Sequence, residues 1–310
     1  MRILVLGSGA GGGLPQWNCG CPGCRAAREG HPEVTPRSQS SIAVSADGER
    51  WLLINASPDV RSQLAAAPAL HPKALRHSPV EAVALSNADI DHCLGLVVLR
   101  EGGAPPIYGT RRTERALREG LRILPVLGAY GAVQFRPVRL DEEIAFADRE
   151  GRPLGVTGRA FAVASKPPPY MLPLLSGDEA RDDLAGDTVA WVLRQGGGPS
   201  VVYVPGVKVL DERLRREVAA SALTLIDGTF WRDDELTSLG ASTKTARDMG
   251  HAPLDGAGGM TEFLESIPGP RKVLIHINNS NPILWERGEA RASVEARGVA
   301  VSHDGLALEV

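Results

Sequence analysis

One stretch of this chain reads Val80-Glu81-Ala82-Val83-Ala84-Leu85-Ser86-Asn87-Ala88-Asp89-Ile90-Asp91-His92. Its first six residues are apolar apart from Glu81 and predict a buried strand. Where that strand gives way to a loop, Asp89, Asp91 and His92 place three metal-capable side chains within four residues. Carboxylates and imidazole together suit zinc, iron or manganese, and a loop at a strand's end lets them converge on one point. The alternative is a polar turn in which Asp89 or Asp91 caps a helix that begins near His92.

The same arrangement recurs further along the chain. Asn55 with Asp59, Asp227 and His276 each follow or end an apolar run, and His251 adds a fifth group from a loop. Taken singly, Asp227 suits a turn, His276 a core histidine and His251 an ordinary loop histidine. Together they predict polar groups gathered along one edge of a sheet, where they would bind a metal or orient a ligand.

Predicted strands outnumber predicted helices and alternate with them. The pattern predicts a hairpin at 41–55, with Asp47-Gly48 at its turn, and helices at 59–67, 110–124 and 209–221. Further strands are expected at 2–6, 80–85, 160–164, 188–193, 201–204, 223–226 and 273–277. This order favours an α/β fold with two mixed sheets covered by helices, a four-layer αββα sandwich, in one domain spanning 1–310.

The composition narrows the classes of function. The 310 residues include 34 basic and 37 acidic side chains, and the net charge of −3 is spread without long runs of one sign. A nucleic-acid surface is therefore not expected. No apolar stretch of about 18 residues occurs, and the N-terminus lacks a signal pattern, so we expect no membrane insertion and a cytoplasmic location.

Three of the four cysteines lie within six residues: Cys19, Cys21 and Cys24. At this spacing three thiolates can wrap one tetrahedral zinc, which predicts a zinc-binding loop at about 17–26. A closed thiolate site leaves no position for a substrate, so the expected role is structural. The fourth ligand is open between His31, which is nearest in sequence, and Asn279. A redox-reactive or incidental cluster is the alternative, and Cys93 is expected to face the core.

Several motifs of this chain resemble those of the metallo-β-lactamase superfamily. Its signature H-x-H-x-D-H becomes Asn87-x-Asp89-x-Asp91-His92 here, and a late strand ends in His276. More narrowly, the chain resembles the coenzyme PQQ synthesis protein B family through four motifs that span residues 18–282. They are Asn18-Cys19-Gly20-Cys21-Pro22-Gly23-Cys24, Asp227-Gly228-Thr229-Phe230-Trp231, Met249-Gly250-His251 and Ile275-His276-Ile277-Asn278-Asn279-Ser280-Asn281-Pro282.

The resemblance implies a set of catalytic and metal-binding residues, with Asp227 as a further metal ligand nearby: Asp89, Asp91, His92, His251 and His276. The chain also departs from the superfamily pattern. Asn87 and Asp89 replace two signature histidines, Ser165-Lys166 stands where another histidine is expected, and Pro205-Gly206 stands where a bridging aspartate usually lies.

These departures bear on the reaction. A two-metal hydrolase needs a bridging carboxylate, which this chain lacks at the usual position. The remaining histidines and carboxylates suit one metal with open coordination positions, as in the non-haem iron oxygenases that use two histidines and one carboxylate. Oxidative chemistry is therefore favoured over hydrolysis.

The resemblance implies a step in the biosynthesis of pyrroloquinoline quinone (PQQ), a redox cofactor built from a Glu and a Tyr of a precursor peptide. The expected enzyme is an oxidoreductase that uses Fe(II) and dioxygen. It would hydroxylate the tyrosine ring of a small-molecule or dipeptide substrate derived from that peptide. A homodimer is compatible with this expectation. Two alternatives stay open: a metal-dependent hydrolase, and a soluble carrier that transports PQQ or its precursor. Side chains suited to an anionic substrate, unless they are solvated, are Arg37, Lys166, Tyr170 and Arg247.

Overall fold

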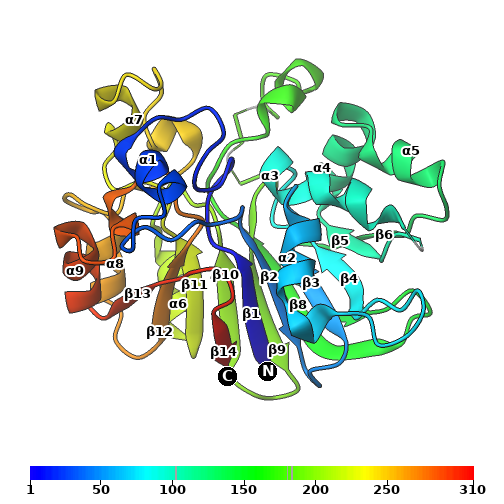
Figure 1. The fold of residues 1–310 in the computed structure, drawn as a ribbon. Coiled ribbons are helices and arrows are strands. Elements are labelled where there is room, and N and C mark those ends of the chain that lie inside the picture. The colour runs from blue at the N-terminus through cyan, green and yellow to red at the C-terminus, as the bar shows by residue number, and fades with distance from the viewer. Residues whose placement is uncertain (102, 180, 183) are drawn as a thin grey trace.

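The computed structural model describes residues 1–101, 103–179, 181–182 and 184–310. Over these residues, fourteen strands form two seven-stranded sheets (Figure 1). The first sheet has the order β14-β1-β2-β3-β4-β5-β6, with β1 (Arg2–Gly7), β2 (Ser41–Ser45), β3 (Trp51–Ile54), β4 (Val80–Ala84), β5 (Ile107–Gly109), β6 (Phe135–Pro137) and β14 (Ala307–Glu309). The second has the order β13-β12-β11-β10-β9-β8-β7, with β7 (Glu143–Ala147), β8 (Pro153–Ala162), β9 (Val189–Gln195), β10 (Ser200–Val204), β11 (Leu223–Asp227), β12 (Arg271–Ile275) and β13 (Val299–Val301).

Both sheets are mixed. In the first, β14, β1, β2 and β3 pair antiparallel, and β3, β4, β5 and β6 pair parallel. In the second, β7 to β10 pair antiparallel and β10 to β13 pair parallel. Because the carboxyl ends of parallel strands meet at one edge of a sheet, each half of the molecule offers an edge on which a ligand site can be built.

Helices cover the outer faces of both sheets. The α-helices are α1 (Pro22–Arg28), α2 (Val60–Ala66), α3 (Ile90–Cys93), α4 (Arg111–Arg115), α5 (Ile123–Gly128), α6 (Glu212–Ala219), α7 (Glu235–Ser238), α8 (Met260–Glu265) and α9 (Glu289–Ala296). Shorter helical turns are η1 (Pro68–Leu70), η2 (Leu94–Arg100), η3 (Ala116–Gly120), η4 (Pro169–Leu174), η5 (Arg247–Met249) and η6 (Pro282–Leu284). In Figure 1, α2, α4 and α5 lie on the side of the first sheet, whereas α8 and α9 lie on the side of the second. Within the ranges that the structure describes, no helix is both long and apolar enough to cross a bilayer.

Three apolar clusters show that the molecule has four layers. The middle cluster lies between the sheets and joins side chains such as Ile42 and Leu52 to Trp191 and Tyr203. A second cluster packs α6, α8 and α9 onto the outer face of the second sheet, and a third packs α2, η2 and α5 onto the first. The αββα sandwich of two mixed sheets predicted from the sequence is therefore confirmed.

One predicted helix is wrong in its continuity. The segment 110–124 was expected to be a single helix, but α4 passes into the π-helical turn η3, and α5 begins only after Arg122, whose φ of 59° is left-handed. Pro125 explains the restart, because a proline has no N–H to donate and its ring clashes with the carbonyl four residues before it. In the first turn of a new helix the same proline costs little.

Candidate metal centre

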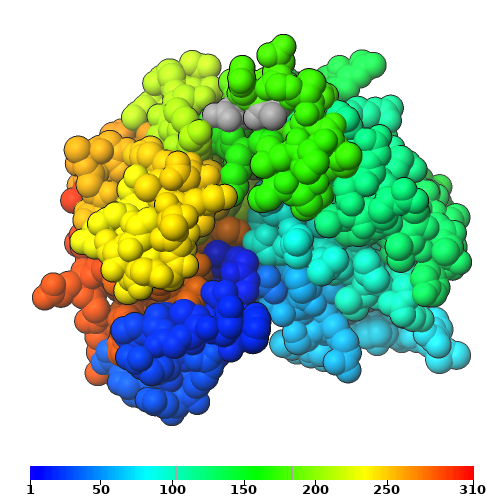
Figure 2. Space-filling model, turned by 90° about the horizontal axis from the view of Figure 1, so that it is seen from above, coloured from blue at the N-terminus to red at the C-terminus, as the bar shows by residue number. Residues whose placement is uncertain are grey.

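A cavity of about 440 Å³ opens where the two sheets bring their parallel strands to an end. Its floor is formed by the segment after β4, by Thr229 just after β11 and by His276 just after β12. Lys166, Tyr170 and Met249 contribute to its walls. Seen from above, the molecule is hollowed between the yellow and green segments, beside the blue N-terminal segment (Figure 2). Polar side chains that follow strands of both sheets therefore line one cavity that is open to solvent.

Asp91, His92 and His276 meet on the floor of this cavity. Each offers one ligand atom, and the three atoms lie within 4.8 Å of one another. Asp91 Oδ2 is 3.2 Å from His276 Nε2 and 3.7 Å from His92 Nε2. The structure thus brings together one carboxylate and two imidazoles from positions 185 residues apart in the chain.

His92 is held in one tautomer by Asn87. The His92 Nδ1–H donates to Asn87 Oδ1 at 2.6 Å, because an amide oxygen can only accept. His92 Nε2 then carries the lone pair, is buried, and makes no hydrogen bond with any described residue. Burial lowers the pKa of His92 to about 4, so the ring is neutral near pH 7. A buried nitrogen acceptor without a partner costs about 1–3 kcal/mol, and a cation would satisfy it.

The strand ends that carry His92 are tied together by Asn55. Asn55 has a left-handed φ of 64° directly after β3, and its carboxamide donates to Ser86 Oγ at 2.9 Å and accepts from Ser86 N–H at 2.9 Å. Both residues are fully buried. Asn55 thus fixes the start of the loop after β4 rather than facing the cavity. Asp59, grouped with it on sequence grounds, instead accepts two hydrogen bonds from Gln39.

Thr229 orients the two histidines on the other side of the cavity. Its hydroxyl donates to Asp227 Oδ1 at 2.6 Å and lies 2.8 Å from His276 Nδ1 and 3.1 Å from His251 Nδ1. His251 Nδ1–H also donates to Asp227 Oδ2 at 2.8 Å. Each imidazole at this centre therefore has its Nδ1 engaged by a neighbouring oxygen. The Nε2 atoms of His92 and His276 lie beside the Asp91 carboxylate, and outer hydrogen-bond partners on Nδ1 are what metal-binding histidines usually have.

Asp227, His251 and His276 form a second metal-capable group, which shares His276 with the first. Its three members surround the Thr229 hydroxyl described above. The Asp227 oxygens also accept from the backbone N–H of Val207 and of Thr229, which brings their hydrogen bonds to four. Burial opposes the ionisation of Asp227, but His251 and its other donors hold the pKa below its ordinary value. This group is therefore built to orient histidines.

The pKa values of the two acids after β4 are shifted in opposite directions. Burial first, and then the charge of Asp91, raises the pKa of Asp89 to about 6. Burial would also raise the pKa of Asp91, but the imidazoles of His92 and His276 hold it below its ordinary value. For His276, burial would lower the pKa, but the hydrogen bond and charge of Asp91 raise it above its ordinary value. The hydrogen bond and the charge of Asp91 therefore act together on the His276 ring.

The remaining sequence predictions divide between this site and the rest of the molecule. Asp89 and His251 line the cavity beside the first group, as do Lys166 and Tyr170. Arg37 is buried elsewhere and donates to Ser8 Oγ, and Arg247 is exposed. Sequence reasoning missed the orienting role of Thr229. An Asp-x-Thr spacing, in which the Thr N–H returns to the aspartate, was the available signal.

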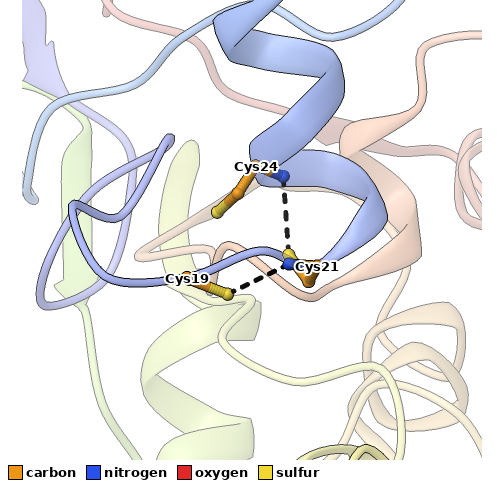
Figure 3. A group of neighbouring side chains, drawn as sticks. All are labelled: Cys19, Cys21 and Cys24. Atoms are coloured by element: carbon orange, nitrogen blue, oxygen red, sulfur yellow. Dashed lines mark hydrogen bonds between the residues drawn. The ribbon is translucent and has the colours of Figure 1, made fainter.

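The three cysteines gather at the start of α1 (Figure 3), and none of them lines the cavity. Cys19, Cys21 and Cys24 place their sulfurs within 4.8 Å of one another at the start of α1. Asn279 Nδ2 lies 3.2 Å from the sulfurs of Cys19 and Cys24 and 3.6 Å from that of Cys21. His31 packs its ring against Trp285 instead. Of the two candidates for a fourth ligand, Asn279 is the one that reaches the thiols.

The comparisons with known proteins place this geometry in a family. Residues 50–277 match the family model of the Beta-lactamase superfamily domain. The chain is 45% identical, over 99% of both chains, to "Coenzyme PQQ synthesis protein B" of Methylobacterium sp. (strain 4-46). The chain belongs to the coenzyme PQQ synthesis protein B family. The crystal structure of Zn(2+)-bound PqqB from Methylobacterium extorquens superposes with a TM-score of 0.90 at 42% identity, covering 100% of both chains.

The family fold extends to more distant proteins. A diphosphatase from the PhnP family superposes with a TM-score of 0.67, covering 100% of this chain and 98% of that one, but only 21% of residues are identical. This likeness shows the fold alone. The zinc bound by the Methylobacterium extorquens protein agrees with the metal-capable side chains that this chain brings together.

Proposed function

We propose that this chain acts in PQQ biosynthesis by hydroxylating the tyrosine ring of a precursor derived from Glu and Tyr, with Fe(II) and dioxygen. One observation carries the proposal. Asp91, His92 and His276 converge on the floor of an open cavity, and the buried His92 Nε2 has no hydrogen-bond partner among the described residues. Two histidines and one carboxylate are the donor set of non-haem iron oxygenases.

The donor set fits one metal better than two. The Thr229 hydroxyl lies within the second metal-capable group, and Asp227 already accepts four hydrogen bonds. Asp91, His92 and His276 would hold the iron, with Asp89 and His251 beside them and Asp227 behind. Iron in this position would supply the redox chemistry that activates dioxygen. A two-metal hydrolytic mechanism is disfavoured by the same contacts.

The walls of the cavity suit an aromatic substrate that carries carboxylates. Phe230, Met249 and Pro169 provide apolar surface for a phenol ring. Lys166 lies at the same cavity, and burial lowers the pKa of its ammonium group. It makes no ion pair or hydrogen bond with the described residues. We infer that Lys166 pairs with a carboxylate of the substrate and so turns the ring toward the floor.

The proposed reaction replaces one ring C–H bond by C–OH. The second oxygen atom of dioxygen is reduced to water, which takes two electrons and two protons from a reductant. The test is a single-turnover experiment with anaerobically loaded Fe(II) protein, a tyrosyl dipeptide containing Glu, ascorbate and ¹⁸O₂. We expect one ¹⁸O atom in the ring by mass spectrometry. No incorporation with verified iron occupancy would refute the proposal.

We also propose that the cysteine cluster holds a structural zinc. Cys19, Cys21 and Cys24 would supply three thiolates, and the neighbouring Asn279 carboxamide, whose Nδ2 donates to the sulfurs here, would supply its oxygen as the fourth ligand. Burial raises the pKa of Cys24 to about 11, so a free thiolate there is disfavoured until a cation is bound. The zinc would fix the loop at about 17–26 against the segment that carries His276.

A further inference from the structure

Asn87 stands where the superfamily signature has its first histidine. Only 5% of this residue is exposed, and both the oxygen and the nitrogen of its carboxamide make hydrogen bonds. Oδ1 accepts from His92 Nδ1–H at 2.6 Å and from the Asp89 backbone N–H at 3.2 Å, and Nδ2 donates to Asp89 Oδ2 at 2.8 Å. One side chain thus contacts both an imidazole and a carboxylate of the metal centre.

We propose that Asn87 is a positioning residue of the metal centre, which sets the tautomer and orientation of His92 and holds Asp89 beside it. The proposal rests on the metal site of the proposed function but not on the reaction. An amide is suited to this task, because it accepts from the imidazole through oxygen and donates to the carboxylate through nitrogen. An aspartate would lose the donor, and a serine is too short to bridge both groups.

The consequence of losing Asn87 follows from the tautomer of His92. A neutral imidazole carries one proton, and that proton stays on Nδ1 because Asn87 Oδ1 accepts it there. Ser86 Oγ lies 3.4 Å from Nδ1, too far to replace a bond of 2.6 Å. Without Asn87 the proton can move to Nε2, which removes the lone pair from the cavity. Loss of such an orienting partner typically weakens metal binding by about 10–100-fold.

The other two histidines at the site already have their own partners. Thr229 lies 2.8 Å from His276 Nδ1, and Asp227 accepts from His251 Nδ1–H. Asn87 does the same for His92, so the three rings follow one rule. The first histidine of the superfamily signature would bind metal, whereas Asn87 at the same position orients His92. The loss of that histidine fits a site for one cation.

The test measures Co(II) binding to full-length protein whose cysteine site is already filled with zinc, without substrate or dioxygen. We expect Asn87→Ala to weaken Co(II) binding by about 10–100-fold. Asn87→Asp keeps an acceptor for His92 and should lose less. The matched control is Gln63→Ala, which removes another buried carboxamide with hydrogen bonds to Ser38, Gln39 and Ser57, away from the cavity. Its affinity for Co(II) should equal that of the unmodified protein.

A second readout reports the tautomer directly. In ¹⁵N-edited spectra of protein that holds zinc in the cysteine site only, the His92 Nδ1–H signal should be present in the unmodified protein and in Asn87→Asp, and absent in Asn87→Ala. Unchanged Co(II) affinity together with a retained signal in Asn87→Ala would overturn the proposal. If Asn87→Ala does not fold, Asn87→Ser compared with Asn87→Asp decides the same point. Failure of ring hydroxylation would leave both readouts unaffected.

Discussion

The cysteine cluster and the histidine–aspartate centre lie on the same chain, yet they are built in opposite ways. The cysteine cluster comes from six consecutive positions, and its sulfurs accept hydrogen bonds from the backbone N–H groups of Cys21 and Cys24 and from Asn279. The histidine–aspartate centre is assembled from the ends of strands in two sheets, and its imidazoles are oriented by the polar side chains of Asn87, Thr229 and Asp227. It opens onto a cavity of about 440 Å³.

The two sites are suited to different roles, because the cysteine cluster would stabilise the fold and the histidine–aspartate centre would carry out the reaction. A closed set of thiolates can stabilise a loop but leaves no position for a reactant. An open set of donors admits reactants, but its geometry must be supplied by surrounding side chains. The two sites meet through one segment, because His276 and Asn279 are three residues apart. Gly23 also lies against that segment, since a Cβ atom there would be 2.9 Å from Asn279 O.

The largest expected effect is on activity at the open site. His92→Ala removes the donor whose Nε2 lacks a hydrogen-bond partner among the described residues, and we expect ring hydroxylation to fall by at least about 1,000-fold, since the metal position loses a ligand. Iron content after anaerobic loading should fall in parallel, while zinc content stays at one per chain. Metal analysis and single-turnover assays check this. Full iron occupancy together with full activity in His92→Ala would show that His92 is not a ligand of the iron.

The next effect is on stability at the closed site. Cys21→Ala should release the zinc and lower the free energy of unfolding by about 3–5 kcal/mol, or roughly 5–10 °C in Tm. His92→Ala should cost less than half as much. Thermal unfolding of both variants, loaded with metal under the same conditions, gives the comparison. Equal losses in the two variants would show that the sites do not divide the roles.

The next effect is on substrate binding at the open site, through Lys166. Lys166→Met keeps the aliphatic stem and removes the charge, so we expect KM to rise by about 10–100-fold while kcat changes little, as for a lost charged hydrogen bond. The control is Arg247→Met, which removes an exposed cation outside the cavity. A substrate whose carboxylates are converted to amides should show no effect of Lys166→Met. An equal effect on both substrates would contradict carboxylate binding.

The smallest effect concerns the pH dependence of the metal-free protein. The pKa of Asp89 is raised to about 6 by burial, so the folded protein retains a proton that the unfolded chain releases near pH 3.8. Stability from this group is full below about pH 4 and is lost as the pH rises through 6. Asp89→Asn should therefore be more stable than the unmodified protein at pH 7.5 by about 1–3 kcal/mol, and by less at pH 5.

Denaturant unfolding at the two pH values measures this difference. The lowered pKa of His92 has the opposite pH dependence, since its contribution is lost as the pH falls from 6.5 toward 4. That contribution is present in both proteins and cancels in the comparison. A difference between Asp89→Asn and the unmodified protein that is the same at both pH values would show that Asp89 titrates normally.

Much of the fold was predictable because hydrophobic runs and turn residues are local signals. The hairpin over 41–55, the strand that precedes His92 and the strand that precedes His276 agree with β2, β3, β4 and β12. The helix expected at 209–221 is α6, shortened because the Asp211 side chain caps it by accepting from Leu214 N–H. Strands β5, β6, β7, β13 and β14 were missed because they are edge or near-edge strands, three to five residues long, with little pattern of their own.

The metal-capable side chains were predictable in kind, since each comes at the end of an apolar run. Their partners were not. The contact of Asn87 with His92 depends on the turn of α3, and Thr229 reaches His276 only because β11 and β12 are neighbours. Such hydrogen bonds depend on how the folded segments pack, which cannot be read from a single sequence. The sequence therefore indicated which side chains could bind a metal, and the structure showed which neighbouring side chains orient them.

We propose that Asp91, His92 and His276 hold one metal between them. X-ray absorption at the iron edge, on anaerobically loaded protein whose cysteine site is filled with zinc, tests it most directly. We expect an iron shell of nitrogen and oxygen only, with imidazole scattering that loses one ring in His276→Ala and another in His92→Ala. Sulfur in the iron shell, or a spectrum unchanged by both substitutions, would contradict it.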